Sequence, residues 1–302
     1  MNKSVHFKTE KFNHASIKTE TEGSLFHYTD ELNTLSTIVE TGFRFSYNFE
    51  EHSERVAKGE DWTLLDNMQL NGVAQPQYGI ATPMICFCDI PLLKATDHRA
   101  KFGNYCIGVN KELIRKELPS LNPLLYYTSN WIYDAIEKLV EFIPTKEEFD
   151  ANLKNTHHPN SKRRTLIYDT GYYSAVKAIV SLTKKYEGNE ARYYDEHEWR
   201  VFFTEAGDPK YSFTREQFEE KKKELNKQLW KDKENSYIRF NNQEDLITYI
   251  IVSKEKEIPE LINKIRGLKT LLGCSFPDDK ESFIKDIIIS KITSFERIEA
   301  DY

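Results

Sequence analysis

The sequence contains no run of apolar residues that approaches the length of a transmembrane helix, and no apolar N-terminal segment that resembles a signal peptide. We therefore expect a cytoplasmic protein with no membrane partner. An excess of positive charge is also lacking. The formal net charge is −6, so there is no global attraction to nucleic acid or to an anionic membrane surface. Any contact with nucleic acid would have to use a local basic patch.

Cysteine is scarce, with four residues in 302. Cys86 and Cys88 are separated by one residue inside an apolar run, which is the wrong spacing for the usual zinc knuckle, and no second pair follows. We predict reduced, mostly buried thiols and no metal site. The chain also has no internal repeat and no low-complexity linker, and its length fits one large domain or two small ones.

Charged and aromatic residues are abundant, at 30% and 13% of the chain, and the 39% hydrophobic content is ample for a core. The most informative stretch is residues 193–203, which we interpret as a strand. Its side chains alternate between a largely apolar face and a charged face, at the two-residue period of a strand. The first face carries His197, Trp199, Val201 and Phe203, and the second carries Glu196, Glu198 and Arg200.

Two carboxylates and a guanidinium on one face of an apolar strand are costly to bury unless they are paired or used. One interpretation is a salt-bridged strand in which Arg200 simply holds a glutamate. The other is a catalytic carboxylate, Glu198, with Glu196 or Arg200 as the companion that orients it. The pattern by itself leaves both interpretations open.

Two further residues occupy positions that suit a ligand. Residues 24–29 are β-prone, and Asp30 is a good N-cap for a helix that Gly42 is placed to end. His27 therefore lies near a strand end that faces a helix N-terminus, where anions and nucleotides bind; the alternative is a half-buried histidine satisfied by a backbone carbonyl. Tyr105 lies between two glycines of a predicted strand over 102–109, and such glycines indicate a bulge or a close approach by a ligand.

Residues 43–80 show few periodic apolar positions, and we predict a long irregular stretch of the kind that is usually functional or mobile. Arg44 within it could meet a phosphate or be an ordinary surface arginine. A continuous apolar strand over 83–88 precedes a short helix that carries His98 near its end. A later polar loop contains a basic cluster, which either meets phosphate or is simply solvated. That cluster comprises Lys162, Arg163 and Arg164.

The character of the chain changes after residue 208. Residues 214–234 form a highly charged helix with sparse apolar positions, which is typical of a surface or partner-binding helix. A strand over 246–252, a helix over 258–265 and a last strand region from 287 to 295 follow. This strand–helix–strand tail either forms a small sheet of its own or extends the main sheet.

A His, a Tyr and a Glu on three separate strands resemble the arrangement used by one group of ADP-ribosyltransferases. In that chemistry nicotinamide leaves the ribose through an oxocarbenium-like transition state, which a carboxylate can stabilise, or the carboxylate can deprotonate the acceptor. A histidine can hydrogen-bond the ribose, and a tyrosine ring can stack on nicotinamide. No metal is needed.

The chain also resembles the AbiGi family of bacterial abortive phage resistance proteins, whose members have been labelled antitoxins. The runs that carry this resemblance are 25–29, 85–91, 102–109 with Lys111, 122–123, 196–200 and 292–298. More distantly, residues 27–29 and the following helix to Gly42 resemble the opening of DarT-like ADP-ribosyltransferases, which modify nucleic acid. The match departs from that family where its NAD-binding arginine segment should be, because neither Arg44 nor Arg55 is a clear counterpart.

These resemblances imply an α+β fold. Residues 1–208 would form an ADP-ribosyltransferase-like mixed sheet core with flanking helices, and residues 209–302 a C-terminal strand–helix–strand extension packed on the same domain. The function implied is a NAD-dependent ADP-ribosyltransferase effector of an antiphage abortive-infection or toxin–antitoxin system, with RNA or DNA as acceptor. The catalytic residues would be Glu198, Glu196 and Arg200, and the residues that hold NAD would be His27, Tyr28, Thr29, Arg44, Tyr105 and His98.

The alternative is a catalytically inactive antitoxin, or protein-binding component, that keeps the same fold. Glu198 and Arg200 then simply pair, and the charged helix over 214–234 docks a cognate toxin partner or a chaperone. A metal-dependent nuclease is a poorer interpretation, because no Asp, Glu and His cluster has ligand spacing.

Overall fold

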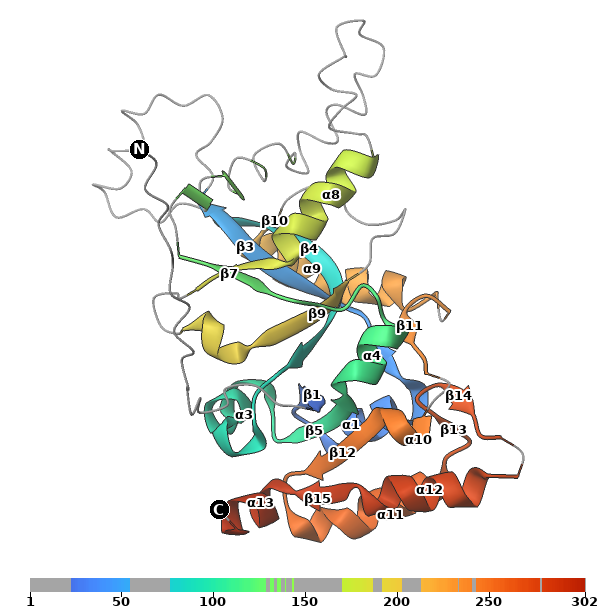
Figure 1. Ribbon diagram of the computed structural model, residues 1–302. Coiled ribbons are helices and arrows are strands. Elements are labelled where there is room, and N and C mark those ends of the chain that lie inside the picture. The colour runs from blue at the N-terminus through green and yellow to red at the C-terminus, as the bar shows by residue number, and fades with distance from the viewer. Residues whose placement is uncertain are drawn as a thin grey trace, which may run out of the picture.

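A single mixed sheet with helices on both of its faces organises the chain (Figure 1), so the α+β class predicted from the sequence is correct. The computed structural model describes residues 23–54, 77–128, single positions between 131 and 143, 170–186, 192–202, 213–232, 234–240, 243–277 and 279–301. The basic cluster at 162–164 lies outside the described residues.

The main sheet has the strand order β15-β12-β5-β1-β4-β9-β6, and β3 and β10 also pair with β4. The pairs are antiparallel except for β12 with β15, which is parallel. The strands are β1 Ser24–Thr29, β3 Ser46–Glu54, β4 Gln77–Cys88, β5 Tyr105–Asn110, β6 Asn122–Pro123, β9 Glu198–Phe202, β10 Phe213–Thr214, β12 Ile247–Val252 and β15 Ile292–Ser294.

Three two-stranded pairs flank this sheet: β2 Phe43–Arg44 with β11 Tyr237–Ile238, β13 Thr270–Leu271 with β14 Cys274–Ser275, and β7 Leu125–Tyr127 with β8 Thr183–Lys185. The α-helices are α1 Leu32–Thr41, α3 Thr96–Phe102, α4 Lys111–Glu117, α8 Thr170–Ser181, α9 Arg215–Leu229, α10 Gln243–Leu246, α11 Ile258–Gly267, α12 Glu281–Ser290 and α13 Phe295–Asp301. Three 3₁₀ turns complete the described elements: η1 Leu92–Lys94, η2 Tyr193–Glu196 and η3 Glu255–Glu257. None of the helices in this part of the chain is long and apolar enough to cross a bilayer.

The two faces of the sheet differ because successive strand residues point to opposite sides. One face carries the larger core, in which Phe87, Ile107 and Val201 pack with residues of α1, α9 and α11. The other face carries a smaller cluster that includes Phe26 and Cys106. Trp199 and Val201 of β9 lie with the larger core, and Glu198 and Arg200, which alternate with them, point to the opposite face.

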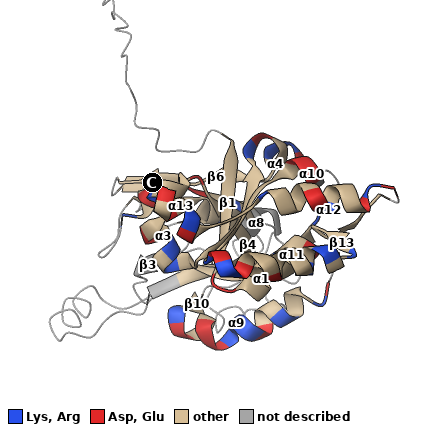
Figure 2. Cartoon of the chain, turned by 90° about the horizontal axis from the view of Figure 1, so that it is seen from below, with Lys and Arg blue, Asp and Glu red and all other residues tan. Residues whose placement is uncertain are grey.

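Helix α9 shows how a charged sequence still anchors to a core. Thr214 accepts a hydrogen bond from the backbone of Gln217, whose side chain returns one, so the helix begins in a capping box. Phe218 and Leu229 are buried on its inner side. The outer side carries charges of both signs (Figure 2), which agrees with the predicted surface helix.

The tail extends the main sheet, since β12 pairs with β5 and β15 pairs with β12. The predicted strand at residues 287–289 is wrong, because these residues belong to α12. A short run of isoleucines fits a buried helix as well as a strand, and Ile284 and Ile288 are one turn apart on the buried side of α12. Helix α1 begins after Glu31 without a side-chain cap, so Asp30 is not its N-cap, whereas Gly42 with φ 88° ends it as predicted.

The predicted irregular stretch over 43–80 is wrong at both of its ends, where β2, β3 and the start of β4 lie. The overlooked signal is an aromatic residue at every second position of a strand: Phe43, Phe45, Tyr47 and Phe49. Phe43, Phe45 and Tyr47 are buried, and Phe49 packs against the same core. The polar residues between them dominate the composition, which is why the stretch looks irregular.

Candidate functional site

Along one edge of strand β4 the neighbouring strand changes from β3 to β1, and a cavity lies beside the interval between these two strands. β3 pairs with β4 as far as Met84, and β1 pairs with it at Cys88, while β9 occupies the opposite edge over the same interval. A cavity of about 520 Å³ is lined by residues of these strands and of α1, α3 and α9. This volume is in the range typical of small-molecule sites.

His27 bridges β1 and β4 within this interval. Its Nδ1 lies 2.7 Å from the carbonyl oxygen of Cys86. Because a carbonyl only accepts, Nδ1 carries the proton and Nε2 of the neutral ring is left as an acceptor. Burial lowers the pKa of His27, which favours this neutral form. The ring packs against Phe43 and Phe87, with centroids 5.4 and 5.7 Å away.

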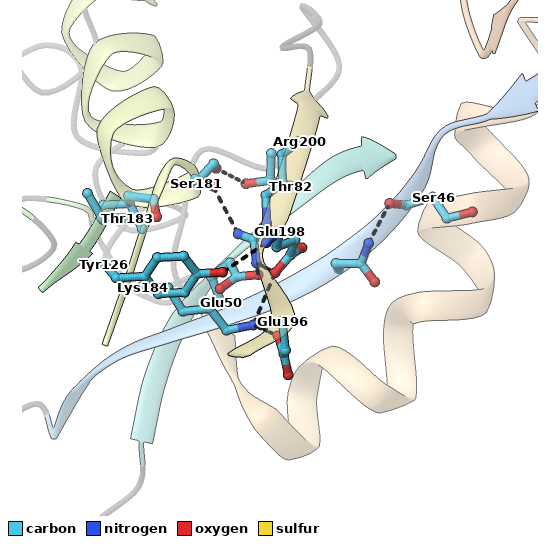
Figure 3. Close-up of polar contacts among 12 residues, drawn as sticks. Ser46, Glu50, Thr82, Tyr126, Ser181, Thr183, Lys184, Glu196, Glu198 and Arg200 are labelled. Atoms are coloured by element: carbon cyan, nitrogen blue, oxygen red, sulfur yellow. Dashed lines mark hydrogen bonds and ion pairs between the residues drawn. The ribbon is translucent and has the colours of Figure 1, made fainter. Parts of the chain in front are cut away.

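The charged face of β9 forms a buried ion pair (Figure 3), and both of its residues line the cavity. Arg200, which is only 2% exposed, donates from Nε to Oε1 of Glu198 at 2.7 Å and from Nη2 to Oε2 at 3.0 Å. Its Nη1 donates to the carbonyl oxygen of Ser181 at 2.9 Å. The backbone N–H of Glu198 donates to the Tyr126 hydroxyl at 3.0 Å. The predicted Glu198–Arg200 pairing is therefore present.

Lys184 and Glu196 complete the network (Figure 3). Nζ of Lys184 donates to Oε2 of Glu196 at 2.7 Å and to Oε2 of Glu198 at 3.1 Å. Lys101 of α3 pairs with the other oxygen of Glu196. The prediction of a strand at Glu196 is wrong, because this residue ends the 3₁₀ turn η2 and His197 adopts a left-handed conformation with φ 40°. Glu196 reaches the same cluster from a turn.

Glu50 of β3 is a third carboxylate of the cluster that sequence reasoning missed. Its Oε1 lies 2.9 Å from Nη2 of Arg200, the nitrogen that also binds Glu198. The alternation of aromatic residues before it would have placed Glu50 on the polar face of a strand. Lys184 was also missed; it lies on β8, which begins two residues after α8 ends at Ser181.

The two carboxylates that share Arg200 have pKa values displaced in opposite directions. Burial by itself raises the pKa of Glu198, but Arg200 and Lys184 outweigh burial and hold that pKa well below its usual range. For Glu50 burial is the stronger influence, and its pKa is raised despite the same two cations. Such opposite displacement of neighbouring carboxyl groups is the condition for distinct acid and base roles.

The other predicted ligand-binding residues divide between the cavity and its surroundings. Tyr28, Arg44 and His98 line the cavity with His27, whereas Tyr105 and Thr29 are not among its lining residues. The Tyr105 hydroxyl instead donates to Glu257 at 2.9 Å. The guanidinium of Arg44 stacks on Trp230, 3.6 Å from the ring centroid. Burial lowers the pKa of His98 to about 4, so its imidazole is neutral near pH 7.

The lining of the cavity combines two kinds of side chain. Glu50, Glu196 and Glu198 contribute carboxylates with their paired cations, and aromatic rings contribute apolar surface. Arg215, Phe218, Glu219 and Lys222 contribute one side of α9. Within the described residues, no group of three or more His, Cys, Asp or Glu side chains could hold a metal ion, and the four cysteines are free thiols. The arrangement suits a polar organic ligand held by charged groups.

The comparisons with known proteins bear on this part of the chain. A family model described as "Putative abortive phage resistance protein AbiGi, antitoxin" matches residues 78–253. The matched segment is more than half of the sequence and includes nearly all of β4, the whole of β9 and Lys184. No curated protein and no solved structure matches the chain.

Proposed function

The chain belongs to the AbiGi family of abortive phage resistance proteins, and we propose that it is the antitoxin component, which neutralises a cognate toxin by binding it. The observation that carries this proposal is that the Glu198 carboxylate is already bound by two cationic side chains. Both of its oxygens already accept hydrogen bonds from Arg200, and one also accepts from Lys184. A carboxylate neutralised in this way has little charge left to stabilise a cationic transition state.

The outer side of α9 supports a protein partner. It exposes positive and negative side chains in nearly equal numbers, so its charge pattern suits a complementary protein surface better than a uniformly anionic nucleic acid. The exposed charged residues of α9 are Arg215, Glu216, Glu219, Glu220, Lys223, Glu224 and Lys227, of which Arg215 and Glu219 also line the cavity. This is the helix that the sequence assigns to partner docking in the antitoxin interpretation.

Growth of cells that express the cognate toxin tests this proposal. Coexpression of the wild-type chain should restore growth, and Glu198→Gln should still restore it wherever soluble protein persists. Reversing two exposed charges of α9, Lys223→Glu with Lys227→Glu, should weaken rescue, whereas the matched double change Arg115→Glu with Lys116→Glu on α4 should not. Failure of the wild-type chain to bind the toxin or to restore growth would overturn the proposal.

An ADP-ribosyltransferase remains a second candidate because one cavity gathers most of the residues predicted for that reaction. His27, Tyr28, Arg44 and His98 line it together with Glu198, although the ring of His27 packs on the larger-core face of the sheet and Glu198 lies on the opposite face. In this proposal Glu198 is the catalytic carboxylate, oriented by its partners, and His27 holds NAD. Residues 1–208 would then be the transferase-like core, residues 209–302 an extension packed on the same domain, and RNA or DNA the acceptor.

Nicotinamide release separates the two candidates. Purified protein incubated with NAD and cellular RNA or DNA should release nicotinamide if it is a transferase, and Glu198→Gln should reduce the rate by roughly a hundredfold or more. The antitoxin proposal expects no release from the wild-type protein under the same conditions. A folded Glu198→Gln protein with undiminished turnover would exclude the catalytic role of this residue.

A further inference from the structure

The three carboxylates that gather around Arg200 and Lys184 differ in how many of their oxygens are engaged. Glu198 uses both oxygens on Arg200, and Glu196 uses one on Lys101 and one on Lys184. Glu50 uses only Oε1, in its ion pair with Arg200. Among the described residues no other hydrogen bond or ion pair of the Glu50 side chain is found, and this side chain is 14% exposed where it lines the cavity.

We infer that Glu50 is the carboxyl group that contacts a ligand in this cavity, and that Glu198 is a positioning residue that holds Arg200 beneath it. Arg200 provides the connection, because one nitrogen, Nη2, lies 2.9 Å from Glu50 and 3.0 Å from Glu198. The bidentate bond to Glu198 fixes the plane of the guanidinium. Glu50 is then held by one oxygen while the other is left for the ligand.

The lining of the cavity indicates the chemical class of that ligand. A carboxyl group with a spare oxygen suits a ligand hydroxyl, as in a sugar ring. Arg44, Arg215 and Lys222 also line the cavity, and cations of this kind suit phosphate groups. Phe49 and Phe218 supply ring surface between these polar parts. The combination fits a phosphorylated sugar, such as the ribose phosphate part of a nucleotide.

The pH dependence of binding gives Glu50 a specific signature. Burial raises its pKa, so part of the population is protonated closer to neutral pH than a surface glutamate would be. If the ligand hydroxyl donates to the ionised form, affinity rises as pH rises through that pKa. The ionisable groups that face Glu50 are Arg200 and Glu198 of β9, Lys184 of β8 and Cys86 of β4, with Glu196 and His98 further along the cavity.

Calorimetric titration of the purified full chain with ADP-ribose tests the inference. We expect the wild-type protein to bind more tightly as pH rises, and Glu50→Gln to bind at least about tenfold more weakly with a flat pH profile. The urea midpoint of Glu50→Gln should stay close to that of the wild type, whereas Glu198→Gln should lower the midpoint. Glu117→Gln, an exposed change on α4, is the matched control and should bind as the wild type does.

The inference is overturned by no binding of ADP-ribose to the wild-type chain at millimolar concentration, or by wild-type affinity and pH profile in a folded Glu50→Gln. If Glu50→Gln fails to fold, Glu50→Asp keeps the charge beside Arg200 but shortens its reach. It should bind more weakly while keeping the pH dependence, and unchanged affinity would overturn the inference. The inference goes beyond toxin neutralisation. ADP-ribose binding is measured without the toxin, so the ligand site can be refuted while toxin neutralisation stands, and the reverse.

Discussion

Arg200→Leu is expected to destabilise the fold by on the order of 3–5 kcal/mol at pH 7, because it removes one partner of a buried ion pair. The guanidinium is 2% exposed, and its loss leaves Glu198 and Glu50 facing each other with Lys184 as the nearest remaining cation. The carbonyl oxygen of Ser181 also loses its donor. Since a domain is stable by about 5–15 kcal/mol, this change removes a large part of the total.

The destabilisation should depend on pH in a predictable direction. In the wild type the pKa of Glu198 lies below its unfolded value of about 4.3, so its contribution is present above that pH and is lost as pH falls through the folded-state pKa. Without Arg200, burial raises the pKa of Glu198 above the unfolded value. The deficit of the variant is then largest near neutral pH and shrinks by about 1.4 kcal/mol per pH unit while Glu198 takes up its proton.

Urea denaturation followed by tryptophan fluorescence at several pH values from about 8 to 5 measures this effect, with an unchanged slope as evidence that the same transition is observed. Arg266→Leu is the matched control, because Arg266 is exposed on α11, and it should change stability by no more than about 0.5 kcal/mol. A deficit below about 1 kcal/mol at pH 7, or one that does not change with pH, would refute the ion-pair argument.

Two further substitutions test the elements that frame the cavity. His27→Phe should cost about 1–3 kcal/mol, because the carbonyl oxygen of Cys86 loses its hydrogen-bond donor; an unaltered urea midpoint would contradict this role. Gly103→Ala should lower the melting temperature by an amount equivalent to more than about 1 kcal/mol, since φ is 108° and an added Cβ would lie 2.1 Å from the carbonyl oxygen of Thr29. Gly267→Ala, with no atom within 4 Å of the added Cβ, is its control, and equal losses in the two variants would refute the steric argument.

Part of the charge cluster could be predicted because it depends on neighbours in the sequence. Glu198 and Arg200 are two residues apart on one strand, so the strand period places them on one face. Glu50 and Lys184 come from other strands, and only the pairing of β3 with β4 and of β7 with β8 brings them to Arg200 and Glu198. No local pattern reports such a pairing.

Tyr105 shows a case in which the local signal was only partly read. The residue does lie in a strand, but β5 begins at Tyr105, and Gly103 with its positive φ ends α3 instead of lying inside the strand. Its hydroxyl nevertheless reaches Glu257 in the turn η3, which the sequence places far along the chain. Which cavity or partner a strand residue meets depends on the element that packs over it, and periodicity carries no information about that element.

The sequence by itself therefore determined the α+β class, most of the main helices, and the positions of β1, β4, β5, β9 and β12, but neither β3 nor α12. These depend on hydrophobic period, caps and breakers within a few residues of one another. Tertiary structure alone decided that β4 exchanges β3 for β1 along one edge, that His27 spans that interval, and that Glu50 shares Arg200 with Glu198. Each of these features joins segments distant in sequence, and their geometry is set by strand register and side-chain packing, which exist only once the chain has folded.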